Sequence, residues 1–276
     1  MRYFTILNIK ISQFLQYRQA AVAGMLTQLF FGMIRVCVFY AFYQQADDNI
    51  PMNFNEVIAY VWLGQIFFAL LPYRVEPEIE LKFRDGSIAY DFLKPIDFYR
   101  YWFAISLSYR LIPTLLRGMP LLLVLILSAP LLAFFGIDMI NQFTLQFAKN
   151  TTYFAYFLVS ILLAIGFSTA LTVLMQISLF WTLSATGVTN SFNALMVLGT
   201  GLVLPLPLFP DKLQWLLEWQ PFRCLFDIPF RLYSGNIPLN EANEALLFQL
   251  CWTLILIGFG QLLLKVAHRQ LVVQGG

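Results

Sequence analysis

Residues 153–208 read YFAYFLVSILLAIGFSTALTVLMQISLFWTLSATGVTNSFNALMVLGTGLVLPLPL and contain no Asp, Glu, Lys or Arg. A fully helical segment of this length would measure about 84 Å, whereas the hydrocarbon core of a bilayer is roughly 30 Å thick. The segment therefore has to cross a membrane twice, and we expect the chain to reverse within residues 181–190.

The composition of the whole chain agrees with a membrane environment. Hydrophobic residues make up 59% of the sequence and charged residues 12%, against about 25% charged residues in an ordinary soluble domain. The basic residues are scattered, which argues against nucleic-acid binding. Three isolated cysteines and a single histidine, His268, offer no ligand cluster for a metal ion.

The hydropathy pattern predicts an all-α integral membrane protein that forms a single domain over residues 1–276. Residues 1–19 carry apolar side chains at helical spacing and predict an interfacial helix. The segment 101–117 is apolar but contains Arg110 and Arg117, which fits an interfacial segment or the inner end of a tilted helix. We expect six transmembrane helices, at residues 20–43, 56–73, 118–137, 153–176, 189–208 and 245–265.

The distribution of basic residues predicts the orientation of the chain, because the side richer in Lys and Arg is normally cytoplasmic. Both termini and the loop 74–100 then lie in the cytoplasm, and residues 209–244 lie outside. The cytoplasmic set contains ten basic residues: Arg2, Lys10, Arg18, Arg74, Lys82, Arg84, Lys94, Arg100, Lys265 and Arg269. The outer set contains four: Lys149, Lys212, Arg223 and Arg231.

The loop 74–100 is the only densely charged segment. Glu76, Glu80 and Arg84 are spaced four residues apart and share one helical face. Gly86 should end this short helix, and Pro95 should end a second one. A short amphipathic helix with exposed charges suits docking to a soluble protein, although a solvated loop with local ion pairs explains the same pattern.

The outer segment 209–244 is rich in Pro and aromatic residues. We expect two short helices that dip into the outer leaflet, with aromatic anchors at the level of the lipid headgroups: Trp215, Trp219, Phe222 and Phe226. Such a hairpin could be an outer gate for substrate or a structural cap over the membrane helices.

Arg35 is a cation within the first predicted span. Charges at such positions are costly and are usually paired or face an aqueous cavity. Arg35 could therefore contact an anionic group in a translocation path, or its side chain could extend to the outer headgroups.

Motifs that the sequence lacks reduce the number of possible functions. The chain has no GxxxxGK[ST] phosphate-binding loop, so any ATP hydrolysis would belong to another protein. No Asp or Glu occurs between Asp138 and Asp211, which disfavours a proton-coupled carrier. No arrangement of catalytic side chains indicates an enzyme.

Two sets of residues resemble the type-2 permeases of bacterial ATP-binding-cassette transporters. The first is RDGSIAYDFLKPID at residues 84–97, followed by Tyr101 and Trp102. The second is LPLFP at 206–210, QPF at 220–222 and PFRLYSG at 229–235. The order of the predicted elements along the chain is also similar to that family.

The resemblance implies that the loop 74–100 is a coupling element that sits in a groove of a cytoplasmic ATPase. That ATPase would hold ATP and Mg²⁺, and this chain would hold no cofactor. The resemblance also implies a pair of permeases, formed by two copies of this chain or by a related second chain. The residues that it assigns to docking are Glu80, Arg84, Gly86, Asp91, Leu93 and Pro95.

We therefore expect a permease subunit of an exporter in the bacterial inner membrane, with an amphipathic or lipid-like substrate. Arg35, Trp215, Trp219 and Phe222 are candidates for the translocation path or its outer gate. A membrane anchor or signalling scaffold, a secondary carrier and a membrane-embedded transferase are the alternatives.

Overall fold

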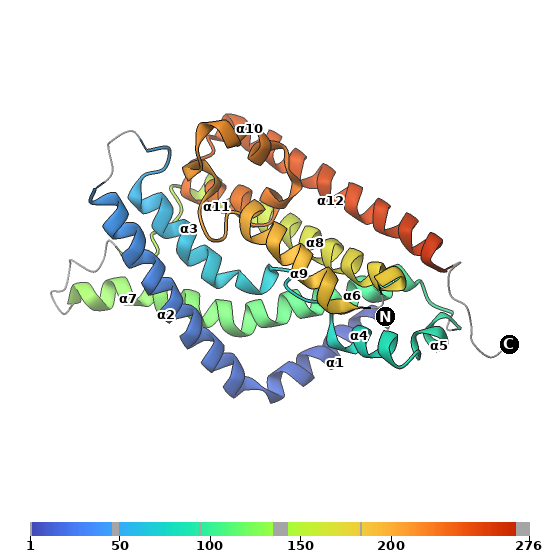
Figure 1. Cartoon of the computed structure of the whole chain (residues 1–276). Helices are drawn as coiled ribbons and strands as arrows, with labels where there is room; N and C mark the ends of the chain where they lie inside the picture. The colour runs from blue at the N-terminus through green and yellow to red at the C-terminus, as the bar shows by residue number, and fades with distance from the viewer. Residues whose placement is uncertain (1, 46–49, 94, 135–142, 183, 269–276) are drawn as a thin grey trace.

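The protein is described by a computed structural model that covers residues 2–45, 50–93, 95–134, 143–182 and 184–268. All regular elements in these ranges are helices, arranged as an elongated bundle (Figure 1). The longer helices are α1 (Arg2–Gln16), α2 (Arg18–Tyr43), α3 (Phe54–Ile66), α6 (Phe98–Pro113), α7 (Met119–Phe134), α8 (Thr151–Thr182), α9 (Ala185–Gly199) and α12 (Leu239–His268). The shorter ones are η1 (Phe68–Leu70), α4 (Pro77–Arg84), α5 (Ile88–Phe92), η2 (Thr114–Gly118), η4 (Leu206–Leu208), α10 (Asp211–Trp219), η5 (Pro221–Cys224) and α11 (Asp227–Ser234).

Helix length separates two groups of membrane segments. Within the described ranges, four helical segments are long and apolar enough to cross a bilayer: Arg18–Tyr43, Phe98–Ser128, Thr151–Thr182 and Leu239–Ala267. Helices α3 and α9 have 13 and 15 residues, so each is only about 20 Å long and cannot span the hydrocarbon core alone. The all-helical membrane architecture is confirmed, and the count of six spans stays a prediction.

The predicted second span, 56–73, is interrupted because α3 ends at Ile66. The carbonyl groups released by this break accept hydrogen bonds from side chains of neighbouring helices. Arg110 donates to the carbonyls of Ala69 and Leu71 at 3.3 and 3.4 Å, and the Ser168 hydroxyl donates to that of Leu70. Unpaired carbonyls would be costly in an apolar environment, so these bonds make the break tolerable.

The predicted start of the third span, residue 118, lies inside a longer helix. A continuous helical rod runs from Phe98 through α6, the π-helical turn η2 and α7. Pro113 lacks a backbone N–H, and a wider turn follows it, in which the N–H of Met119 donates to the carbonyl of Thr114 five residues back. The segment 101–117 is thus continuous with a membrane-length helix, which agrees with the second interpretation of its sequence, the inner end of a tilted helix. The predicted end of this span, residues 135–137, lies outside the described residues.

Helix α8 is the centre of the bundle, and it packs against α6, α11 and α12. Polar pairs bind it to its neighbours: the Ser160 hydroxyl donates to the Gln249 Oε1 atom at 2.7 Å, and Gln176 Nε2 donates to the Ser106 hydroxyl at 2.9 Å. Such pairs hold helices together where lipid offers no polar partner. Helix α8 ends at Thr182 and α9 begins at Ala185, within the predicted reversal at 181–190.

Helix α9 is followed by an irregular segment whose backbone requires a glycine at position 201. Gly201 has a φ of 78°, and a side chain there would collide with the Tyr60 hydroxyl. Pro205 and Pro207 then exclude a regular helix. The predicted fifth span, 189–208, therefore contains a helix that ends at Gly199.

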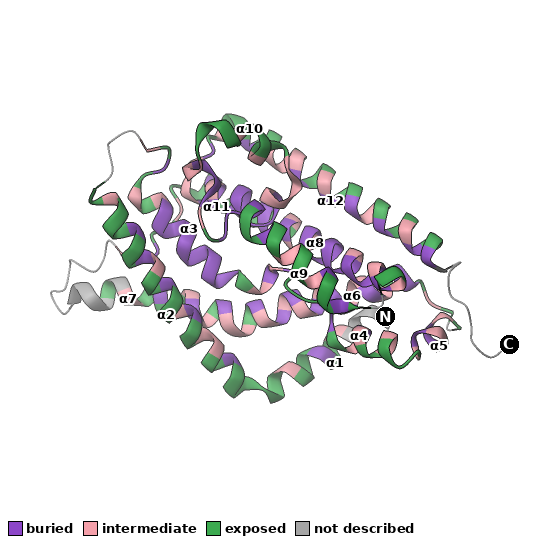
Figure 2. Cartoon of the chain, in the orientation of Figure 1, coloured by how far each residue is buried: buried purple, intermediate pink, exposed green. Residues whose placement is uncertain are grey.

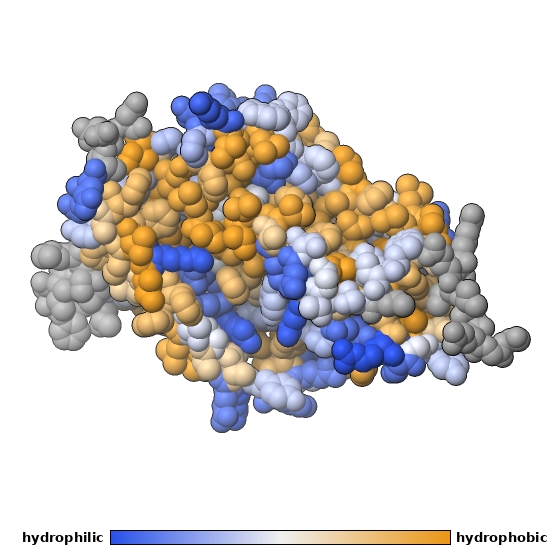
Figure 3. Space-filling model, viewed as in Figure 1, coloured by the Kyte–Doolittle hydropathy of each residue, from blue (hydrophilic) through white to orange (hydrophobic). Residues whose placement is uncertain are grey.

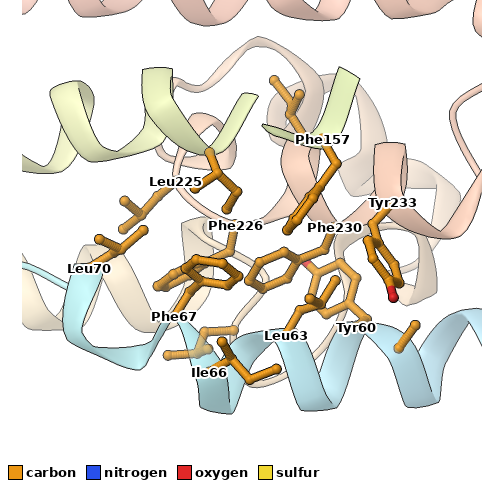
Figure 4. Packing of buried hydrophobic residues seen from close by; sticks show 14 of the residues in the cluster. Tyr60, Leu63, Ile66, Phe67, Leu70, Phe157, Leu225, Phe226, Phe230 and Tyr233 are labelled. Carbon is orange, nitrogen blue, oxygen red and sulfur yellow. The ribbon is translucent and has the colours of Figure 1, made fainter. Parts of the chain in front are cut away.

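The two helices of the outer segment differ sharply in burial. No residue of α10 is buried, whereas Asp227–Tyr233 except Arg231 are all buried in α11 (Figure 2). Figure 4 shows Phe226 and Phe230 packed among Tyr60, Phe67 and Phe157 in the core. Of these two helices, α10 has the exposure expected at a membrane surface, and α11 is part of the core. The prediction that Phe226 is a headgroup anchor is therefore wrong, because its side chain is completely buried.

Candidate functional site

The charged loop folds into a helical hairpin, which we call the α4–α5 hairpin (Pro77–Phe92). Pro77 begins α4 at a position where its missing N–H costs nothing. Gly86 connects the two helices with a φ of 74°, and open space surrounds it. The Ser87 side chain and the Ser87 backbone N–H, which donates to Asp85 Oδ1 at 2.9 Å, both lower the pKa of the Asp85 carboxyl. The loop is therefore a structured turn.

The inner side of the α4–α5 hairpin packs against the ends of three membrane helices. Phe83 meets Phe180 of α8 edge-on at 4.8 Å between ring centroids, and Phe92 stacks on Phe98 of α6 at 4.0 Å. Trp102 is completely buried beneath them. The same cluster includes Ile79, Ile88, Val173, Ile177, Leu264 and Ala267. Aromatic pairs of this kind add stability beyond the apolar area that they bury.

Ion pairs fix the α4–α5 hairpin at its edges. Lys10 of α1 contacts Glu78 at 2.6 Å, and the Lys10 side chain is 10% exposed. Burial lowers the pKa of Lys10, but the hydrogen bond and charge of Glu78, together with Tyr109, outweigh burial and raise that pKa above its ordinary value. Within the hairpin, Lys82 pairs with the buried Asp91 and so joins α4 to α5. These contacts make the hairpin rigid relative to the membrane helices.

A buried pair, Glu76 and Arg110, links the base of the hairpin to the bundle interior. Arg110 Nη2 lies 3.3 Å from Glu76 Oε1 and donates to the Thr172 hydroxyl of α8 at 2.9 Å. Burial raises the pKa of Glu76 to about 7, although Arg110 and Arg74 oppose this change. One guanidinium therefore connects the loop, α6, α8 and the end of α3.

The outer side of the α4–α5 hairpin presents a mixed apolar and cationic surface. Leu81, Tyr90 and Leu93 are 58%, 71% and 81% exposed, and the Arg84 side chain is 78% exposed. Figure 3 shows hydrophilic residues gathered over α4 on a face that is otherwise largely apolar. Exposed Tyr and Arg side chains on a rigid support are typical of a protein-binding surface.

The structure places the predicted docking residues in two groups. Arg84, Gly86, Leu93 and Pro95 are exposed, and Glu80 is half-buried and contacts Arg84 at 3.8 Å. Asp91 is buried, so its observed role is to hold α5 against α4. Lys94, one of the basic residues of the predicted cytoplasmic set, lies outside the described residues, as does Arg269.

Several residues of this site did not emerge from the sequence. The sequence favours burial of Leu81, because apolar side chains are more often buried, but the structure exposes both Leu81 and Tyr90. Arg110 did carry a signal in the sequence, because a cation inside an apolar helix requires a partner. The acidic residues nearest to it along the chain were ambiguous, and only the tertiary structure selects Glu76.

The candidates for a translocation path lie on separate elements. Arg35 of α2 is half-buried and donates to the carbonyl of Leu202 at 2.9 Å. Trp215 and Trp219 of α10 are 67% and 75% exposed, and Phe222 of η5 packs against Gly199. Gln214 secures α10 by donating to the carbonyls of Leu206, Pro207 and Phe209.

Comparison with known proteins assigns the chain to a family. No curated protein and no solved structure is similar enough to this chain to count as a match. Residues 29–275 match the family described as ABC-2 family transporter protein, which covers the bundle and the α4–α5 hairpin. Members of this family are membrane transport subunits that associate with an ATP-binding-cassette ATPase. This multi-pass membrane protein therefore belongs to the ABC-2 family of transporter proteins.

Proposed function

We propose that the chain is the permease subunit of an ATP-driven exporter, and that the α4–α5 hairpin couples it to a cytoplasmic ATPase. The observation that carries this proposal is the two-sided character of the hairpin. Its inner side is fastened to α1, α6, α8 and α12, and its outer side exposes Leu81, Arg84, Tyr90 and Leu93.

This arrangement suits the transmission of force. A displacement applied to the outer surface of a rigid, well-packed element passes to the elements beneath it, because packed interiors deform little. The Glu76–Arg110 contact and the aromatic cluster connect the hairpin to α6 and α8, two of the four membrane-length helices. Closure of ATPase subunits would therefore move whole membrane helices as rigid bodies.

The rest of the proposal concerns substrate, assembly and location. An amphipathic or lipid-like substrate fits the aromatic, nearly uncharged sequence of α8 and α9. A second permease, identical or related, would supply the other wall of the pathway. The proximity of α1 and of the end of α12 to the α4–α5 hairpin supports an arrangement with both termini in the cytoplasm of a bacterial inner membrane.

Charge reversal at Arg84 tests the coupling role. We expect Arg84→Glu to abolish co-purification of the ATPase and to lower substrate-stimulated ATP hydrolysis at least about tenfold, because it replaces an exposed cation at the centre of the docking surface. Lys212→Glu is the matched control, since Lys212 is an exposed cation on α10. Equal retention of the ATPase by both variants would contradict the assignment of the docking surface.

A transport assay tests the substrate class. Proteoliposomes that contain the permease and its ATPase should move a fluorescent lipid-like probe only when ATP is present. Transport that continues on a proton gradient after ATP is removed would indicate a secondary carrier. An ATPase rate that no lipid-like compound changes would indicate a scaffold.

A further inference from the structure

An apolar cavity lies between α3, α7 and the beginning of α8. Its volume is about 550 Å³, within the range of ligand pockets. The walls are almost entirely aliphatic and aromatic, and include Leu63, Ile66, Ile126, Phe157 and Leu158. Such a space would hold a hydrocarbon chain and exclude polar ligands.

A polar pocket of about 210 Å³ adjoins this cavity. The two share Phe147 and Tyr233 in their walls. The Tyr233 hydroxyl donates to the carbonyl of Gln146 at 2.8 Å and so fixes the ring between them. Phe147 is 80% exposed, so its ring can shift without loss of packing. The two pockets are therefore neighbours, one apolar and one polar, and they meet at these two rings.

The polar end offers one cation and one carboxylate, Lys149 and Glu56. The Lys149 ammonium lies 5.9 Å from the centre of the Tyr153 ring, and Lys149 is exposed. Glu56 Oε2 is held by the backbone N–H of Asn53 at 3.0 Å and by Asn236 at 3.2 Å. A carboxylate held by hydrogen bonds and an exposed ammonium in the wall of one pocket complement a head group that carries both charges.

The length of the two pockets along α3 agrees with that of an acyl chain and its head group. Glu56 and Ile66 stand at opposite ends of α3, ten residues and about 15 Å apart along the helix axis. The polar pocket contains Glu56, near the start of α3, and the apolar cavity contains Ile66, at its end.

We propose that this site binds one bilayer phospholipid with a zwitterionic head group. One acyl chain occupies the apolar cavity, the phosphate lies beside Lys149, and the ammonium group lies beside Glu56. The bound lipid is a structural partner of the permease. The proposal therefore stands independently of which substrate is exported.

The test measures lipid binding to the purified permease without its ATPase, by native mass spectrometry. The probes are phosphatidylethanolamine, phosphatidylglycerol and diacylglycerol with identical chains. We expect one molecule of phosphatidylethanolamine to remain bound, with several-fold weaker binding of the other two. Leu158→Trp fills the cavity and should weaken binding at least about tenfold, because the acyl chain loses its burial. Ile126→Phe is a second cavity-filling variant, for use if Leu158→Trp does not fold.

Leu162→Trp is the matched control, because Leu162 is exposed one helical turn further along α8 and outside the cavity. Equal binding by the cavity-filling variants and this control would overturn the site. Lys149→Gln should remove the preference for phosphatidylethanolamine over diacylglycerol, and a preference that persists would overturn the role of Lys149. In vesicles that also contain the ATPase, the lipid should stay bound through turnover. Release at every ATP cycle would identify it as cargo and overturn the structural role.

Discussion

Two arginines of the bundle donate hydrogen bonds to backbone carbonyls that follow the ends of short helices. Arg110 donates to the carbonyls of Ala69 and Leu71 after α3, and Arg35 donates to that of Leu202 after α9. A guanidinium carries several donors in a planar group, so it can satisfy carbonyls that a broken helix leaves unpaired. Arg35 is thus a structural partner of the backbone here, and its part in a translocation path stays a prediction.

The pH dependence of stability should report the buried Glu76. Its pKa is about 7 in the folded protein, against an ordinary value of 4.5. Between these values the folded protein binds a proton that the unfolded chain has released, so the contribution of Glu76 to stability falls as the pH rises. The free energy of unfolding should fall by about 3 kcal/mol over this range, and Glu76→Gln should remove this pH dependence. Unfolding midpoints of both proteins in detergent between pH 4.5 and 7.5 measure the difference, and a constant difference would refute this prediction.

At the scale of elements, the α4–α5 hairpin is held mainly by aromatic contacts with α8. Phe180 contacts Phe83, Phe92 and Trp102, at 4.8, 5.9 and 6.1 Å between ring centroids. Phe180→Ala should destabilise the hairpin by about 2 kcal/mol, less than for a fully buried Phe because Phe180 is partly exposed. Hydrogen exchange should then rise in residues 77–92 and stay unchanged in α8.

Phe259→Ala is the control for this variant, since Phe259 is exposed on α12. Faster exchange of the hairpin in both variants, or in neither, would mean that Phe180 does not anchor it.

At the scale of the whole molecule, the hairpin and α10 belong to opposite ends of the bundle. Helices α4 and α5 lie near the start of α1 and the end of α12, and α10 lies near the start of α12 (Figure 1). A membrane that the long helices cross would therefore separate Tyr90 from Trp215, both of which are exposed.

Cysteine labelling tests this topology. After Cys37, Cys224 and Cys251 are replaced, a cysteine at position 215 should react with a membrane-impermeant maleimide in intact spheroplasts. A cysteine at position 90 should react only after the membrane is opened. The cysteine-free chain controls for background, and labelling of both positions from one side would refute the proposed orientation.

The sequence by itself determined the membrane environment, the helical class, the reversal after Thr182 and the short helices around Gly86. These follow from local properties: hydropathy over a window of residues, and the backbone freedom or rigidity of Gly and Pro. The exposure of Arg84 also follows, because a charge in a short amphipathic helix favours water.

Only the tertiary structure decided where the predicted spans are broken, which acid pairs with Arg110, and that Asp91 is buried while Tyr90 is exposed. It also decided that α11 belongs to the core and α10 to the surface. The physical reason is that a buried charge or a freed carbonyl needs a partner, and that partner comes from residues far away in the chain. Hydropathy shows that a buried charge or free carbonyl is unfavourable at a given position. Tertiary packing determines which group forms the hydrogen bond or ion pair with it.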